Sequence, residues 1–213
     1  MKIAIFGASG ATGQLLTEHS LAAGHTVIAL VRNPGTFSLR DKVQIVEGNA
    51  FDLSAVSRTV EGSDVVFSAL GAHSPIRNEN VLPRAVPLIV QAMQQTGVRR
   101  IIALGSAGAL PDSLEKQPVW RRWIVQKIVY KFFLKWPVHE QVMQYRILAG
   151  SELDWTMVMP SVLTNGPARG RYRIDGDALP RNGKSISRAD VAKFMFQQLE
   201  SAQWLRRGVY LSN

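Results

Sequence analysis

Three glycines that follow a short apolar run at the start of the chain constrain its fold more than any other feature. Residues 2–6 read as a buried strand, and Gly7, Gly10 and Gly13 follow it, ahead of a helical pattern. This spacing permits a tight turn, a close approach of ligand to backbone, and close packing of helix on sheet. Free N–H groups at the positive end of a helix dipole bind phosphate, so a dinucleotide is predicted. The expected contacts of its diphosphate are Gly7, Ser9, Gly10, Ala11, Thr12 and Gly13.

The remaining sequence alternates between apolar runs typical of buried parallel strands and amphipathic segments typical of helices. This order predicts an α/β fold, a Rossmann-like doubly wound parallel sheet with helices on both faces. Strands are expected at 2–6, 26–31, 43–46, 65–69, 100–104, 155–159, 172–174 and 209–211. Helices are expected at 11–23, 53–60, 81–96 and 188–200, the last of them capped by Ser187 with Asp190. Pro83 and Pro87 place the true start of the third helix near or after the second proline.

A chain of 213 residues without repeats or linkers is expected to form a single domain, 1–213. Residues from about 160 to 213 should form the wall of a substrate cleft, and a basic amphipathic insert lies at about 112–137. In a helix over 120–136, apolar residues would occupy one face (Trp120, Trp123, Ile124, Ile128, Phe132, Phe133) and lysines another (Lys127, Lys131, Lys135). Three interpretations stay open: a lid or wall of the cleft, a surface for self-association, or docking to an anionic membrane or acidic partner.

Composition excludes several classes of site and partner. The chain has no cysteine, which rules out disulfides and cysteine-based catalysis or zinc binding. Its four histidines lack metal-ligand spacing, so no metal is expected. The net charge of +9 comes with no nucleic-acid-binding motif, so a nucleic acid is not expected either. No apolar run could span a bilayer and no signal peptide is recognised, which favours a cytoplasmic location. The chain is expected to be a monomer or a homodimer.

The second apolar run ends in Arg32, nineteen residues after Gly13, where NAD-binding folds carry an acidic residue. A guanidinium pairs with a 2′-phosphate, which a carboxylate would repel, so NADP(H) is the expected cofactor. Arg40 is a weaker candidate for a second phosphate contact. Asn49 and Ala50 follow the third run and are expected at the adenine edge.

The carboxyl ends of the later strands should hold the reacting groups, because ligands bind there in open α/β sheets. Leu70, Gly71 and Ala72 are expected beside the nicotinamide ribose, and Ser161 and Val162 near its ring. Ser106 is the candidate catalytic residue, bonding the nicotinamide amide or a substrate carbonyl. His73 and His139 are further candidate proton donors.

Several segments resemble the atypical short-chain dehydrogenase/reductase group that contains biliverdin-IXβ reductase, or NADPH flavin reductase, with NmrA-like relatives. The residues that carry the resemblance are 3–13, 30–32 with Pro34, Ser106-Ala107, 153–160, 165–172 and 186–192. The resemblance implies an NADPH-dependent reductase that transfers hydride to a planar conjugated acceptor: a flavin, a biliverdin-like tetrapyrrole or a quinone. It also leaves open a non-catalytic NADP(H)-sensing regulatory protein.

The chain departs from typical short-chain dehydrogenases in one respect that bears on mechanism. Their Tyr-x-x-x-Lys pair is absent, because Tyr130 is followed by Leu134 and Tyr145 by Ala149. A conjugated acceptor delocalises incoming charge and can take its proton from solvent. A site with few titratable groups, which mainly positions the two reactants, is therefore expected.

Overall fold

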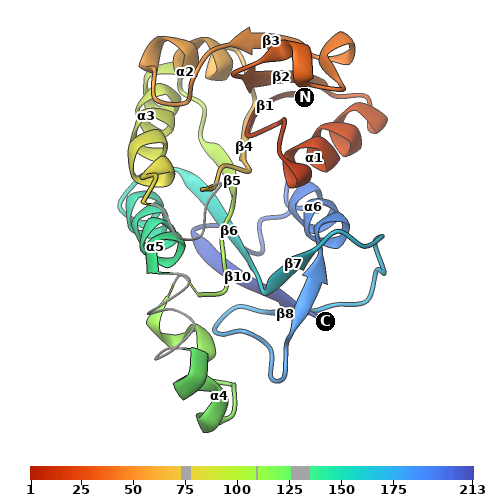
Figure 1. The fold of residues 1–213 in the computed structure, drawn as a ribbon. Coiled ribbons are helices and arrows are strands. Elements are labelled where there is room, and N and C mark those ends of the chain that lie inside the picture. Colours follow the sequence, from red (N-terminus) through yellow and green to blue (C-terminus); the bar gives the residue numbers. More distant parts are fainter. Residues whose placement is uncertain (73–77, 109, 126–134) are drawn as a thin grey trace.

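An eight-stranded sheet forms the centre of the computed structural model, which describes residues 1–72, 78–108, 110–125 and 135–213. Its strand order is β3-β2-β1-β4-β5-β6-β10-β8 (Figure 1). The strands are β1 (Lys2–Phe6), β2 (Thr26–Val31), β3 (Gln44–Glu47), β4 (Val65–Ser68), β5 (Arg100–Leu104), β6 (Asp154–Pro160), β8 (Arg173–Asp175) and β10 (Arg207–Ser212). Neighbouring strands are parallel, except that β8 runs antiparallel to β10. The expected fold class is confirmed.

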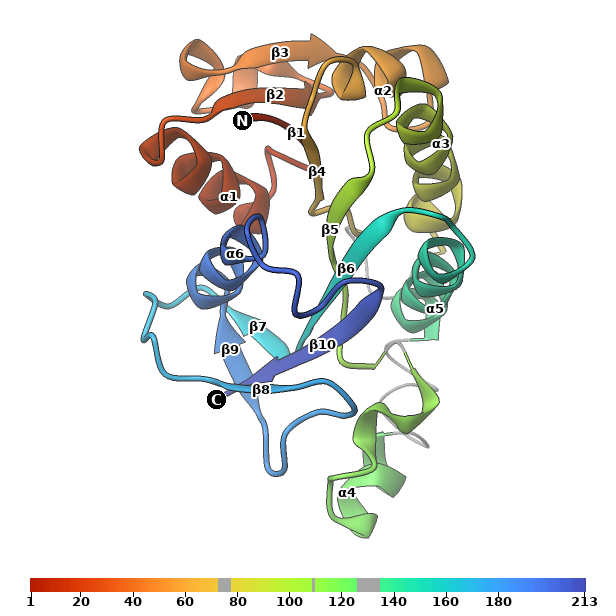
Figure 2. The ribbon, with the colours of Figure 1, turned by 180° about the vertical axis from the view of Figure 1, so that it is seen from behind.

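Helices cover both faces of the sheet (Figures 1 and 2). One face carries α2 (Leu53–Val60), α3 (Val81–Thr96) and α5 (Lys135–Ala149), and the other carries α1 (Ala11–Ala22) and α6 (Arg188–Gln197). The short helix α4 (Val119–Ile124) extends away from the sheet. A parallel sheet covered on both faces needs strands that are apolar at every position, which explains their continuous apolar runs.

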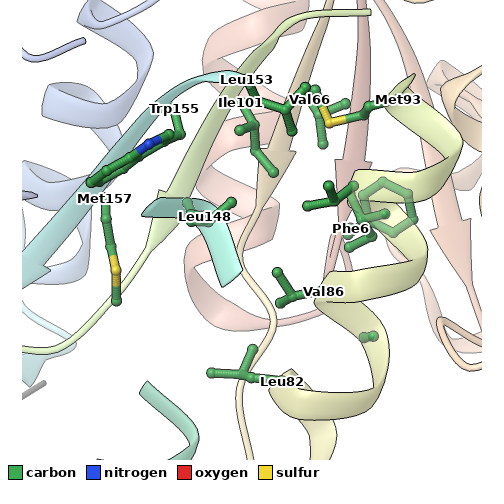
Figure 3. Packing of buried hydrophobic residues seen from close by; sticks show 14 of the residues in the cluster. Phe6, Val66, Leu82, Val86, Met93, Ile101, Leu148, Leu153, Trp155 and Met157 are labelled. Carbon is green, nitrogen blue, oxygen red and sulfur yellow. The ribbon is translucent and has the colours of Figure 1, made fainter. Parts of the chain in front are cut away.

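The first strand shows how alternate residues supply two separate cores. Ala4 and Phe6 belong to the cluster beneath α2, α3 and α5, whereas Ile3 and Ile5 belong to the cluster beneath α1 and α6. None of the four side chains is accessible to solvent. Figure 3 shows Phe6 in the first cluster near Met93 of α3, with other strand residues of the same core.

The first and last helices pack against each other on the second face. The ring of Phe196 in α6 lies 6.0 Å from that of His19 in α1 and 5.9 Å from that of His25, just beyond α1. At the start of α6, the Asp190 N–H donates to the Ser187 hydroxyl (3.0 Å), as the expected capping pair requires.

Helix α3 begins at Val81, so the expected start near or after Pro87 was wrong. Pro83 lies in the first turn, where a backbone N–H has no partner within the helix and its loss costs nothing. Pro87 lies inside the helix and removes one internal hydrogen bond. A side chain from another helix supports this end, because the Leu82 N–H donates to the Glu140 carboxylate of α5 at 3.0 Å.

Other elements differ from expectation in extent or were not expected. The sequence analysis did not anticipate α5, nor the small parallel pair of β7 (Val162–Thr164) and β9 (Ser185–Ser187). Helix α6 stops at Gln197 instead of continuing to residue 200, and β6 includes Pro160. Of the insert, residues 126–134 fall outside the described residues, so the proposed faces of a 120–136 helix are seen only in part.

Candidate functional site

A cleft of about 1060 Å³ opens at the carboxyl ends of the parallel strands, where the strand order reverses between β1 and β4. Open α/β sheets bind ligands at this point. Most of the site residues expected from the sequence line the cleft, whereas Gly13 does not. The lining residues among them are Gly7, Ser9, Gly10, Ala11, Thr12, Arg32, Asn49, Ala50, Leu70, Gly71, Ala72, Ser106, Ser161 and Val162. Arg40, the weaker phosphate candidate, is not among the lining residues.

The glycine turn brings the start of α1 against the end of β4. Gly7 has a φ of +79°, and a Cβ there would lie 2.7 Å from the Ala69 carbonyl oxygen. A Cβ on Gly13 would lie 2.0 Å from the Gly7 carbonyl oxygen, so Gly13 allows α1 to pack on the turn instead of facing the cleft. No side chain caps the start of α1 at Gly10. The N–H groups of its first turn are therefore available to a diphosphate, and the turn fits one.

The loops after β2 and β3 form one end of the cleft, next to the glycine turn. Arg32 lines it and is exposed to solvent. The Asn49 side-chain oxygen accepts the Phe51 N–H at 3.2 Å, which fixes this side chain at the turn. Phe51, which the sequence analysis missed, also lines the cleft, and the Arg84 guanidinium stacks 3.9 Å from its ring centre. Among the described residues, neither loop places a carboxylate in this part of the cleft.

The turn after β5 holds Ser106 half-buried in the middle of the cleft. Its neighbours Gly105 and Ala107 donate backbone hydrogen bonds to the carbonyls of Val158 (2.7 Å) and Pro160 (2.9 Å), which fix the turn against β6. The Ser161 hydroxyl lies 3.2 Å from that of Ser212, so it takes part in holding β6 to β10.

Of the two histidines considered as proton donors, the structure describes His139. His73 lies outside the described residues. His139 belongs to α5 but is exposed and does not line the cleft.

Beyond Ser106 the cleft continues between the insert, α5 and the C-terminal loops. The sequence analysis missed these lining residues: Leu114, Gln117, Arg121, Arg122, Val125, Pro137, Glu140, Gln141, Leu179, Gly183, Lys184 and Arg188. Their positions depend on contacts between distant segments. Of the three interpretations of the insert, the wall of a cleft agrees best with these positions.

The insert is fastened to the C-terminal loop through three side chains. The Gln117 amide donates to the carbonyls of Leu179 and Pro180, both at 2.9 Å, and accepts from Arg121. Arg121 also donates to the Gly183 carbonyl at 2.7 Å. Lys116 lies 2.6 Å from Asp175, and this hydrogen bond raises the pKa of Lys116. These contacts fix α4 beside the cleft, and its side chains Trp120 and Trp123 are 67 % and 58 % exposed.

Charge is unevenly distributed along the cleft. Arg32 lines the cleft just after β2, whereas Arg121, Arg122 and Lys184 line its far part beside the insert, where Arg121 bonds Gly183; Arg188 lines the cleft as well. Glu79 and Glu140 are the carboxylates among the described lining residues. An excess of cations favours ligands that carry phosphate or carboxylate groups.

Comparison with known proteins agrees with this geometry. The sequence model of a family described as NAD(P)H-binding matches residues 7–202. The chain belongs to this NAD(P)H-binding family. This match confirms the expected relationship to NAD(P)-binding Rossmann proteins and the expected nicotinamide dinucleotide cofactor. No group of three or more metal-binding side chains was found in the described part of the chain, and none of its helices is long and apolar enough to cross a membrane.

Relatives and solved structures extend over almost the whole chain. The reductase pytE of Aspergillus terreus is 26% identical over 92% of this chain and 90% of its own length. A short-chain dehydrogenase/reductase of Veillonella parvula, solved in complex with NADP, superposes with a TM-score of 0.81 at 22% identity, covering 100% of this chain and 94% of that one. ChuY, an anaerobilin reductase of Escherichia coli O157:H7, gives 0.79 at 21% identity, covering 100% and 97%. The two structures show the shared fold. The enzyme class expected from the sequence, an NAD(P)H-dependent oxidoreductase, is consistent with the family and with these relatives.

Proposed function

We propose that this member of the NAD(P)H-binding family is an NADPH-dependent reductase that transfers hydride to a planar conjugated acceptor such as a flavin, a biliverdin-like tetrapyrrole or a quinone. The continuity of the cleft carries the proposal. Its volume of about 1060 Å³ slightly exceeds the roughly 300–1,000 Å³ of most small-molecule sites. A dinucleotide along the glycine turn and Arg32 would leave the region between Ser106, Leu114 and Leu179 open for a second molecule.

NADPH is favoured over NADH by the residues at the end of β2. The Arg32 guanidinium would bind the 2′-phosphate, and none of the described lining residues in the loops after β2 and β3 carries a negative charge that would repel it. A charge-assisted hydrogen bond to a phosphate is roughly twice as strong as one between neutral groups. An NADPH-dependent reductase needs a compartment in which NADP is kept reduced. We therefore propose the cytoplasm as its location.

The proposed reaction needs the protein mainly to position two rings. Hydride from the bound nicotinamide supplies the chemistry, and the acceptor takes its proton from solvent. Ser106 would bond the nicotinamide amide or an acceptor carbonyl, and its turn is held rigid by the bonds of Gly105 and Ala107 to β6. The far cations, Arg122 and Lys184 among them, suit an acceptor with negatively charged substituents.

The second candidate is a non-catalytic NADP(H)-sensing protein. The exposed apolar side of α4 favours it, since Val119 is 78 % exposed beside the two tryptophans and such a patch suits a partner. A sensor needs no room for an acceptor. The open part of the cleft therefore favours the reductase.

Steady-state oxidation of NADPH with flavin mononucleotide, biliverdin and a naphthoquinone tests the choice. A reductase should consume NADPH with at least one acceptor and show a much higher KM for NADH. Tight binding of NADPH without turnover of any acceptor would replace the reductase by the sensor.

A further inference from the structure

One short helix holds half of the large apolar side chains that the described part of the chain exposes to solvent. Of eight such side chains, four belong to the six residues of α4: Val119, Trp120, Trp123 and Ile124. At about 100° of rotation per residue, these four positions span about 140° of the helix, so they form one continuous face. The proposed reductase reaction makes no use of this apolar face of α4.

Contacts elsewhere on the insert hold α4 to the body of the molecule and leave the apolar face uncovered. Arg121 donates to the Gly183 carbonyl of the C-terminal loop at 2.7 Å. Lys116, just ahead of the helix, lies 2.6 Å from Asp175 and 3.8 Å from Asp177, so these two acids are already paired. Figures 1 and 2 show α4 at the end of the molecule opposite β3, away from the sheet. A large partner can therefore reach the apolar face without displacing the described part of the fold.

Positive charge surrounds the apolar face. Helix α4 contains two arginines and no acid, and the C-terminal loop adds the exposed cations Arg181 and Lys184 on either side of Gly183. Along the sequence, no Asp or Glu occurs from residue 116 to residue 139, whereas six cations do: Lys116, Arg121, Arg122, Lys127, Lys131 and Lys135. This distribution of charge is complementary to an anionic partner.

The composition and the size of the apolar face favour a lipid bilayer over a protein. Tryptophan combines an apolar ring with a polar N–H and is enriched where the hydrocarbon of a membrane meets water. Cations near such a face are attracted to anionic headgroups. A stable protein complex usually buries about 800 Å² on each partner, which is more than the side chains of one six-residue helix provide.

We propose that α4 binds the surface of an anionic phospholipid bilayer. Trp120 and Trp123 enter the bilayer at the level of the headgroups, and the surrounding cations attract the lipid phosphates. The contact involves few side chains, so the binding is reversible and depends on salt. It is independent of the reaction that takes place in the cleft.

Sedimentation with phospholipid vesicles tests the binding directly. Wild-type protein should bind vesicles of phosphatidylcholine and phosphatidylglycerol in equal parts at least tenfold more tightly than vesicles of phosphatidylcholine alone, and added salt should reduce this difference. Brominated lipids in the anionic vesicles should quench the tryptophan fluorescence. Equal affinity for both kinds of vesicle, or binding to neither, would overturn the proposal.

Replacement of Trp120 and Trp123 by serine tests whether α4 is the face that binds. Both side chains are mostly exposed, so the double variant should keep the wild-type circular dichroism melting curve and affinity for NADPH. Its affinity for the anionic vesicles should fall at least tenfold, and most of the quenching should disappear. Ile174→Ser, at an exposed apolar residue of β8, is the matched control and should bind like wild type. A folded double variant with wild-type affinity for the vesicles would contradict the assignment of α4.

A second pair of variants tests the role of local charge. Arg181→Gln combined with Lys184→Gln should weaken binding to anionic vesicles about tenfold to thirtyfold, because each basic residue near an anionic surface contributes roughly fivefold. Arg40→Gln combined with Lys42→Gln removes the same charge from exposed residues ahead of β3 and should have a much smaller effect. Equal weakening in both pairs would show that net charge alone attracts the protein and would overturn the proposal.

Analytical ultracentrifugation distinguishes a bilayer from a second copy of the chain as the partner. The proposal expects the wild type and the tryptophan double variant to have the same oligomeric state. A wild-type dimer that becomes a monomer in the double variant, without binding of either protein to vesicles, would assign the apolar face to self-association instead.

Discussion

Substitution of Gly10 by valine should separate nucleotide binding from folding. Gly10 has φ −76° and ψ 161°, which any residue can adopt. An added Cβ would meet only the Gly7 carbonyl oxygen, at 3.3 Å, so the fold requires a shift of a few tenths of an ångström. The isopropyl group would instead occupy the space through which a diphosphate reaches the first turn of α1.

The expected loss follows from the hydrogen bonds that the diphosphate would make there. Each bond from a backbone N–H to a charged oxygen contributes about 1.5–3 kcal/mol, so losing two costs about 3–6 kcal/mol. The dissociation constant for NADPH should rise about 10²- to 10⁴-fold. Calorimetric titration measures the affinity, and thermal melting followed by circular dichroism shows that the variant is folded.

Two comparison variants sharpen this test. Gly166→Val makes the same change at an exposed glycine with nothing within 4 Å of an added Cβ, and it should alter neither affinity nor melting. Gly13→Ala should destabilise the fold by about 1–3 kcal/mol or more, because its Cβ would lie 2.0 Å from a backbone oxygen. Undiminished NADPH affinity in a folded Gly10→Val protein would refute the placement of the diphosphate.

Three more variants probe other parts of the molecule. Arg32→Ala should weaken NADPH binding roughly tenfold to a hundredfold and leave NADH binding nearly unchanged, because a charge-assisted contact of about 1.5–3 kcal/mol is lost. Arg40→Ala, at a residue outside the cleft, is the control. An equal loss of affinity for both nucleotides would show that Arg32 does not bind the 2′-phosphate. Ser106→Ala should slow turnover less than tenfold and leave its pH profile flat near neutrality, whereas a thousandfold loss, about 4 kcal/mol, would make the serine essential. Asp190→Ala should lower stability by about 3 kcal/mol, or roughly 6–12 °C in Tm, because the buried carboxylate accepts the N–H groups of Arg169 and Gly170 and the Ser187 hydroxyl. Burial alone would raise the pKa of Asp190, but those hydrogen bonds outweigh it and lower the pKa. The carboxylate should therefore stabilise the fold above about pH 4 and lose this effect as the pH falls further. Acid titration of the stability of the Asp190→Ala variant should lack that loss.

The nucleotide half of the cleft could be predicted because its signals are local. Gly7, Gly10 and Gly13 follow a strand within a few residues, and Arg32 ends the next strand. The contacts that a diphosphate needs come from one turn and one helix end, which a short segment specifies completely.

The other half depends on contacts between distant residues, which no local pattern contains. Glu140 supports a helix start 58 residues earlier, and Gln117 bonds a carbonyl 62 residues later. A contact between distant residues also explains why the predicted start of α3 was wrong. Pro87 removes one hydrogen bond inside α3, and the turns before it are supported by the bond from the Leu82 N–H to Glu140, two residues that only the folded chain brings together.

The packing of α1 on α6 has a consequence for the order in which the chain becomes competent to bind. The strands around the glycine turn are complete within the first 70 residues, yet one side of α1 stays uncovered until Phe196 is in place. A chain that is still being synthesised therefore carries the glycine turn and Arg32, the proposed phosphate contacts, but lacks the support that holds α1 in position. A ligand that binds only the finished fold stabilises all of it by mass action, so NADPH should protect even α6, which lies far along the chain from the glycine turn, against unfolding and proteolysis.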